Sequence, residues 1–176
     1  SQFRMVEGLG VFSLALDANG WVECRLKKGS NGEWQLDVSQ DDTRKPMYFR
    51  YKGNDEETNL LMDIFNNRLE KVPQSILDAF SRNNHVVDNL RGAMLKVILI
   101  TQSGAEGISL RHVREVHILE PYWNEIRINQ VVGRAVRARS HVDLPEKDRT
   151  VQVYRYMMKL DAERVRKSKT IQNKDD

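Results

Sequence analysis

Two short, almost wholly apolar runs constrain the fold of this chain more than any other feature. The first, at 95–100, has the sequence LKVILI, and the second, at 116–119, has the sequence VHIL. Near-continuous hydrophobic runs of this length are typical of strands buried on both faces, which occur almost only in parallel sheets covered by helices. We therefore expect an α/β domain with a mainly parallel central sheet.

Helical and strand patterns alternate along the rest of the chain, which favours helices on both faces of that sheet. Asn19-Gly20 suits the end of the first helix, because glycine accepts the left-handed conformation that follows a helix. Asn54 or Asp55 suits the cap of the second helix, and Pro73 suits the first turn of the third. We predict helices at about 6–19, 55–67 and 73–80, and further strands at 21–26, 47–51 and 151–157.

The length of 176 residues suits one domain. Two polar stretches, about 27–46 and 81–92, are predicted to be insertions, and the first has room for a small hairpin. The end of the chain, 159–176, is a charged tail. The expected organisation is therefore a domain at 1–158 followed by this tail.

Composition excludes several classes of protein. Cys24 is the only cysteine, so an internal disulfide and a cysteine-rich zinc site are excluded. The four histidines have no metal-ligand spacing, so no metal site is predicted, and no apolar run approaches the length of a membrane span. The net charge of +3 is too small to indicate a nucleic-acid partner by itself. We expect a soluble, intracellular protein without a membrane partner.

One segment concentrates arginine donors beside an apolar face. In QVVGRAVR, at 130–137, a helix would place Gln130, Arg134 and Arg137 within roughly 60° of one another, opposite a valine-rich face. Such an array of donors suits the oxygens of a phosphate chain, and Gly133 removes a side chain where a ligand could approach. An ordinary amphipathic helix with solvated arginines is the alternative.

The first apolar run leads into the loop TQSGAEGIS, at 101–109, which has two glycines and several short polar side chains. Ligands of parallel sheets bind at the carboxyl ends of the strands. A loop of this composition can offer backbone N–H groups to phosphate. Many strand-to-helix loops look like this one, so its value lies in its place one strand before the arginine segment.

These segments together resemble the motifs of superfamily 2 helicases. The pattern Q-x-x-G-R-x-x-R at 130–137 resembles motif VI, the loop at 101–109 resembles motif V, and Ser1-Gln2-Phe3 resembles motif IV, which in the family follows a further strand. The segment at 120–124 resembles the Trp-Asn segment of Snf2-type translocases. Several stretches resemble the helicases and transcription-factor ATPases of large DNA viruses. The resemblance implies a RecA-like three-layer domain.

The resemblance also implies residue roles. Arg134 and Arg137 match arginine fingers that reach the γ-phosphate of ATP bound on another domain. Ser109 stands where many relatives have a ribose-binding aspartate, which leaves its ribose contact open. The residues that match ATP-binding positions are Gly107, Ser109, Gln130 and Gly133, and those that match nucleic-acid-binding positions are Gln2, Thr101 and Ser103.

The sequence contains no G-x-x-x-x-G-K-[ST] phosphate loop. Asp55-Glu56-Glu57-Thr58 superficially matches a magnesium box, but acids in the first turn of a helix are ordinary dipole partners. We therefore expect ATP and Mg²⁺ to be bound mainly by an N-terminal ATPase domain of a longer chain, and this chain alone to be inactive. The expected function is the C-terminal half of a helicase or translocase acting on nucleic acid, with DNA favoured over RNA. A non-catalytic nucleic-acid- or protein-binding module is the alternative.

Overall fold

The computed structural model describes residues 8–84, 87–101, 104, 107–119 and 124–157. Predictions for Gln2, Ser103, the segment 120–123 and the tail 159–176 lie outside this part of the chain. The described helices are α1 Leu9–Ala18, α2 Glu56–Phe65, α3 Gln74–Asn84 and α4 Glu125–Ala135. The described strands are β1 Val22–Glu23, β2 Leu26–Lys28, β3 Trp34–Leu36, β4 Met47–Arg50, β5 Val97–Leu99, β6 Glu115–Ile118 and β7 Gln152–Arg155.

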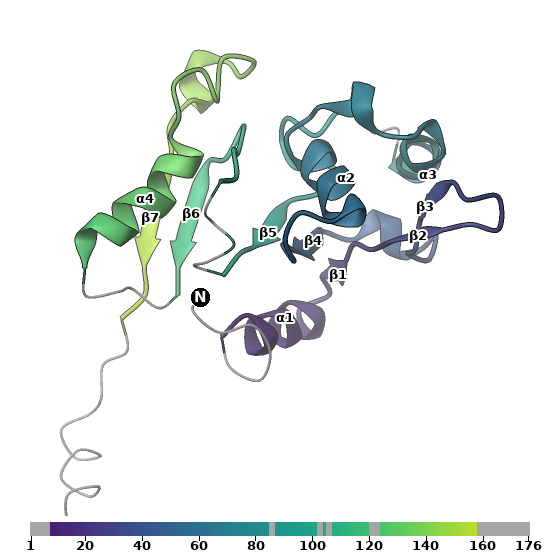
Figure 1. The fold of residues 1–176 in the computed structure, drawn as a ribbon, viewed down its shortest axis with the longest axis horizontal. Helices are drawn as coiled ribbons and strands as arrows, with labels where there is room; N and C mark the ends of the chain where they lie inside the picture. The colour runs from purple at the N-terminus through teal and green to yellow at the C-terminus, as the bar shows by residue number, and fades with distance from the viewer. Residues whose placement is uncertain (1–7, 85–86, 102–103, 105–106, 120–123, 158–176) are drawn as a thin grey trace, which may run out of the picture.

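Parallel pairing dominates, which confirms the predicted α/β fold class. Strands β1, β4 and β5 form one parallel sheet in that order, and β6 and β7 form a second parallel pair. Strands β2 and β3 form an antiparallel hairpin, as the polar stretch at 27–46 allowed. Figure 1 shows the hairpin extending away from the larger sheet. No described helix is long and apolar enough to cross a membrane.

Helices cover both faces of the larger sheet, as predicted. Side chains alternate along β4, so Phe49 faces one side, where it packs with Ile64 of α2 and Ile76 of α3, while Tyr48 faces the other, where it packs with Leu9 of α1. Phe49, Ile64 and Ile76 are completely buried. Each such side chain stabilises the fold by about 1.5–3 kcal/mol through its removal from water. The result is the three-layer arrangement expected of a RecA-like domain.

The strands differ from the single sheet that the sequence pattern favours. Among the described residues, β5 does not pair with β6, and a cavity of about 880 Å³ lies between them, lined by residues from both strands. A parallel strand needs a crossover of a dozen or more residues, usually helical, to return beside its neighbour. Fifteen residues separate the two strands, and no helix longer than a turn is described among them.

Two boundaries also differ from prediction. Helix α3 continues to Asn84, past the predicted end near 80, because no glycine or proline interrupts the sequence before that point. The strand predicted at 21–26 ends at Glu23, and Leu26 belongs to the hairpin. The reason is local: the Leu26 N–H donates to the Glu57 carboxylate at 3.1 Å instead of extending the ladder with β4.

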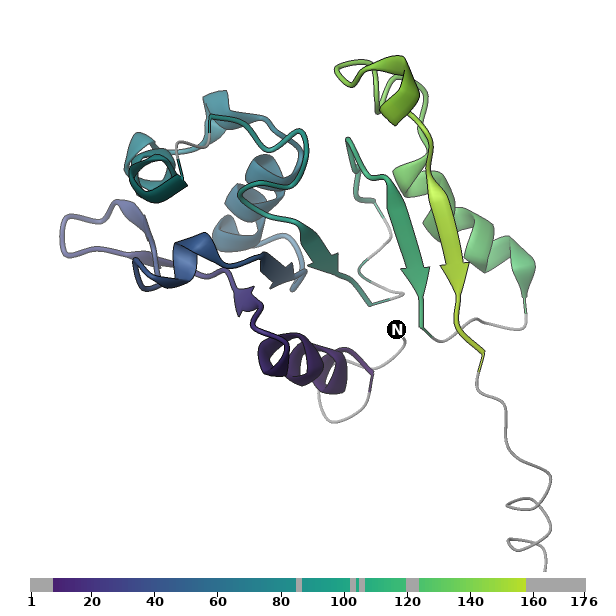
Figure 2. The ribbon, with the colours of Figure 1, turned by 180° about the vertical axis from the view of Figure 1, so that it is seen from behind.

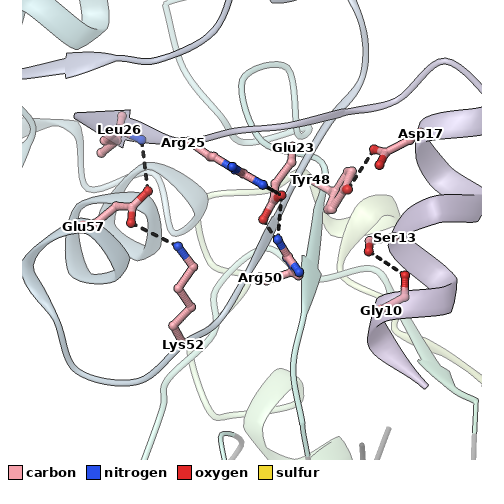
Figure 3. Close-up of polar contacts among 10 residues, drawn as sticks. All are labelled: Gly10, Ser13, Asp17, Glu23, Arg25, Leu26, Tyr48, Arg50, Lys52 and Glu57. Carbon is pink, nitrogen blue, oxygen red and sulfur yellow. Dashed lines mark hydrogen bonds and ion pairs between the residues drawn. The ribbon is translucent and has the colours of Figure 1, made fainter. Parts of the chain in front are cut away.

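A charged cluster fixes the carboxyl ends of β1 and β4 (Figure 3). The Glu23 carboxylate accepts hydrogen bonds from Arg50, at 2.7 and 2.9 Å, and from Arg25, at 2.6 and 3.2 Å. Burial alone would raise the pKa of Glu23, but the hydrogen bonds and charges of the two arginines outweigh it and hold the pKa below its ordinary value. The ionised form of Glu23 therefore stabilises the folded state.

Replacing this carboxylate should cost stability in a pH-dependent way. We expect Glu23→Gln to lower the free energy of unfolding by about 1–3 kcal/mol at pH 7, since two arginines lose a charged partner. A carboxyl whose pKa is lowered on folding stabilises above its unfolded pKa, and this contribution is lost as pH falls through the folded value. The difference between wild type and variant in urea melts should therefore shrink from pH 7 to pH 3. An equal difference in stability at both pH values would contradict this role of ionised Glu23. Glu70→Gln, at an exposed position, is the control.

Candidate functional site

Helix α4 carries the first part of the arginine segment. Its start is capped by the Asn124 side chain, which accepts the Ile126 N–H at 2.9 Å. Ile128 and Ala135 are its buried residues, whereas Gln130 is exposed and Arg134 is half-buried. The two polar side chains are one turn apart on the helix, so this part of the predicted face is present.

The helical prediction was wrong for the end of the segment. Helix α4 ends at Ala135, and Val136 leaves helical geometry with φ −105° and ψ 62°. Arg137 therefore lies beyond the helix, and its position does not follow from helical spacing. Val136 is 53% exposed and does not belong to the apolar face assigned to it. The chain departs from the helix just where the second arginine follows.

The structure brings Arg137 to the loop that follows β5. Its guanidinium donates a hydrogen bond to the Ser109 hydroxyl. Beside this contact, the Leu110 N–H donates to the Arg134 carbonyl at 3.4 Å. The motif V and motif VI segments therefore lie in direct contact, which is the arrangement that a two-part site requires.

Asn66 holds the other side of the same loop, and sequence reasoning missed it. Its side chain is completely buried. The amide donates to the Ser109 carbonyl at 3.0 Å and accepts the Arg111 N–H at 2.8 Å. Asn66 directly follows α2, and an asparagine at that position is typical of a helix cap. The sequence gives no sign that its amide spans to a loop 43 residues away.

The segment after Arg137 is tied back to the segment after Ser109. The His112 N–H donates to the Ser140 carbonyl at 3.0 Å, and the His112 ring contacts Asp143 at 3.0 Å. The His141 ring lies 2.7 Å from the Ser140 hydroxyl and 2.5 Å from the Val113 carbonyl oxygen. These contacts are hydrogen bonds within the protein. No group of three or more metal-ligating side chains occurs among the described residues.

The loop after β5 is shaped by Thr101. Its side chain is 3% exposed, and its hydroxyl accepts the Gly104 N–H at 3.2 Å. A Cβ atom on Gly104 would lie 3.0 Å from the Tyr51 ring, so the glycine permits close packing. Gly107 has φ +81°, a backbone conformation that residues other than glycine rarely adopt. Thr101 thus builds the turn, and its proposed contact with nucleic acid stays a prediction.

Gly133 lies on the open side of α4. It is exposed, and an added Cβ would meet no atom within 4 Å. Nothing in the described part of the fold therefore requires glycine there for space. Thr101 and Arg134 both line the cavity between β5 and β6, so the two segments also share that space.

Comparison with known proteins agrees with these motifs. Residues 54–139 match the family model of the helicase conserved C-terminal domain, which spans from the start of α2 to just beyond Arg137. The chain is 40% identical over 95 residues to a protein of Acanthamoeba polyphaga mimivirus named as an ATP-dependent RNA helicase. That match covers 51% of the chain and 21% of the relative.

Two further relatives come from other large DNA viruses. The termination factor NPH-I homolog of African swine fever virus is 45% identical over 69 residues, 39% of the chain and 10% of the relative. Nucleoside triphosphatase I of Melanoplus sanguinipes entomopoxvirus is 33% identical over 90 residues, 51% of the chain and 13% of the relative. The chain thus spans about a fifth or less of these three relatives. No solved structure matches the chain significantly.

Proposed function

Because the chain carries a helicase conserved C-terminal domain related to the helicases of large DNA viruses, we propose that it is the C-terminal motor domain of an ATP-dependent helicase or translocase. Its role is to supply arginine fingers and part of the nucleic-acid track. The single observation that carries this proposal is the contact between Arg137 and Ser109, which joins the two motif segments.

The donor groups of the site suit phosphate. Arg134, Arg137 and Gln130 offer guanidinium and amide N–H groups, and planar guanidinium donors match phosphate oxygens. Proteins usually bind Mg²⁺ through one or two carboxylates together with substrate phosphates, and the side chains proposed here include no carboxylate. We therefore propose that this domain contacts the phosphates of ATP, while an N-terminal ATPase domain of the same full-length protein holds Mg²⁺ and most of the nucleotide.

Arginine donors would act on charge that develops during phosphoryl transfer. Fingers of this kind accelerate hydrolysis by about 10³–10⁵-fold, or about 4–7 kcal/mol of barrier. Arg134 is fixed by the helix, whereas Arg137 follows its end and reaches the Ser109 loop. Closing of the two domains around ATP would bring both guanidinium groups to the γ-phosphate, and reopening after hydrolysis would let the motor step along the strand.

The domain organisation follows from the same proposal. We assign 1–158 to the motor domain, with insertions at about 27–46 and 81–92, and 159–176 to a charged tail. We propose nucleic acid as the partner, contacted by the loop at 101–109 and by motif IV at Gln2. One relative is named as an RNA helicase and another as a termination factor, so both DNA and RNA should be tested as the partner.

The direct test is ATP turnover by the full-length protein with and without nucleic acid. We expect turnover to rise when double-stranded DNA or single-stranded RNA is added, because a motor couples hydrolysis to its track. Binding of nucleic acid without ATP hydrolysis under any of these conditions would instead support a non-catalytic binding module.

Gly133 provides a sharper version of this test. Alanine at this position meets no neighbouring atom and raises helix propensity, so Gly133→Ala should stabilise the fold by up to about 1 kcal/mol. If a phosphate group or the partner domain approaches there, the added methyl group should lower ATP turnover at least about 10-fold, since small misplacements of reacting groups have large effects on rate. Thermal melting and turnover are measured on the same preparation. A more stable variant with wild-type turnover would show that Gly133 faces only solvent.

A further inference from the structure

We propose that Ser109 and Asn66 are positioning residues for Arg137, so that α2 sets the placement of an arginine finger that belongs to a distant segment. This inference rests on the proposed function, because it assigns a role to the residues that support the finger. It gives Ser109 a task different from the ribose contact of the aspartate found in many relatives.

Arg137 needs support that the helix cannot give. It follows the end of α4, where Val136 has already left helical geometry, and it is exposed. An arginine side chain in this position has many rotamers, and each of them points the guanidinium elsewhere. The hydrogen bond from its guanidinium to the Ser109 hydroxyl selects one of them.

Ser109 can perform this task only if its own backbone is fixed. Asn66 provides the fixation, because its buried amide bonds the Ser109 carbonyl at 3.0 Å and the Arg111 N–H at 2.8 Å. A buried amide that loses such partners leaves polar backbone groups unpaired, so the arrangement resists displacement. The path therefore runs from the end of α2, through two backbone bonds and one hydroxyl, to the guanidinium.

The strength of the last contact suits a finger that must move. A neutral hydroxyl holds arginine less strongly than a carboxylate does, because charge-assisted hydrogen bonds are roughly twice as strong. Serine can thus orient Arg137 in the open protein and release it when a phosphate competes for the guanidinium. An aspartate at this position would hold the arginine as an ion pair.

Substitution of Ser109 in the full-length protein tests the last step of the path. We expect Ser109→Ala to lower kcat for ATP by about 3–10-fold, the effect of one hydrogen bond, with little change in KM. Ser109→Thr keeps the hydroxyl and should retain most of the turnover. Ser75→Ala is the control. The Ser75 hydroxyl donates a hydrogen bond to a backbone carbonyl, that of Trp34, and Trp34 belongs to neither motif segment.

A double mutant separates positioning from a general structural role. If Ser109 acts through Arg137, then adding Ser109→Ala to Arg137→Lys should lower kcat by much less than it does in the wild type. Additive losses, or wild-type kcat in Ser109→Ala, would overturn the positioning role while leaving the finger intact. Near-normal turnover in Arg137→Lys alone would instead show that Arg137 is not a finger, and the positioning role would fall with it; the proposed function falls only if Arg134→Lys is near-normal as well.

Asn66 is tested against an equally buried amide that does not touch the loop. Asn89 is 3% exposed and bonds the backbone of Phe65, Met94 and Leu95. We expect Asn66→Ala and Asn89→Ala to lower the melting temperature alike, and only Asn66→Ala to lower kcat of the folded protein below the melting transition. Equal kcat in the two variants would overturn the role of Asn66. If Asn66→Ala does not fold, the Ser109 variants still test whether the Ser109 loop positions Arg137.

Discussion

Replacing Arg137 with lysine in the full-length protein should lower kcat for nucleic-acid-stimulated ATP hydrolysis by at least about 100-fold, since whole fingers contribute about 10³–10⁵-fold. Lysine keeps the positive charge but loses the planar fork of donors that matches phosphate oxygens. Arg137 is exposed and its described bond is to Ser109. Folding stability should therefore change by no more than about 0.5 kcal/mol.

The same substitution at Arg134 should lower kcat by a similar factor. Arg134 is half-buried and lines the same cavity as Thr101, so thermal melting of this variant must accompany the kinetics. Arg139→Lys is the matched control, because Arg139 is exposed near the same turn but lies outside the motif pattern. Near-normal turnover in both motif variants would support the amphipathic-helix alternative. Loss of turnover with loss of folding would show that the arginines support structure.

The second large effect concerns the 176-residue chain by itself. We expect it to hydrolyse ATP at no measurable rate and to bind nucleic acid weakly, because its sequence has no phosphate loop and its donors are proposed to complete a site on another domain. Joining it to the N-terminal ATPase domain should restore turnover by the factor that fingers contribute, about 10³–10⁵-fold.

Circular dichroism of the separate chain is the necessary control, since an unfolded chain would also be inactive. Steady turnover by the pure chain, abolished by a substitution within it, would show that a complete nucleotide site lies in these 176 residues. That result would contradict the division of labour between two domains.

Sequence patterns predicted the parts of the fold that depend on local periodicity. The apolar run at 95–100 contains β5, and Asp55 caps α2 by accepting the Thr58 N–H at 2.8 Å. Gly20 has φ +80°, as the end of α1 requires. These features depend on neighbouring residues, so the sequence contains the information needed to predict them.

Features that depend on tertiary contacts could not be predicted in this way. No glycine or proline directly follows α4 to mark its end, and Val136 continues the apolar spacing of the preceding helix. The separation of β5 from β6 depends on how the 15 residues between them, 100–114, cross from one strand to the other. Asn66 looks like an ordinary cap until its bonds to Ser109 and Arg111 are seen. The candidate site was therefore located by motif, but its internal connections required the structure. Both ribbon views show the β6–β7 pair set apart from β4 and β5 (Figures 1 and 2).

The most direct test of the central claim is a structure of the full-length protein bound to nucleic acid and to an analogue of the ATP transition state. The proposal predicts that Arg134 and Arg137 each place a guanidinium N–H about 2.7–2.9 Å from an oxygen of the γ-phosphate mimic, the distance of a charge-assisted hydrogen bond. A closed complex in which both arginines contact only solvent, or only the backbone of the nucleic acid, would contradict it.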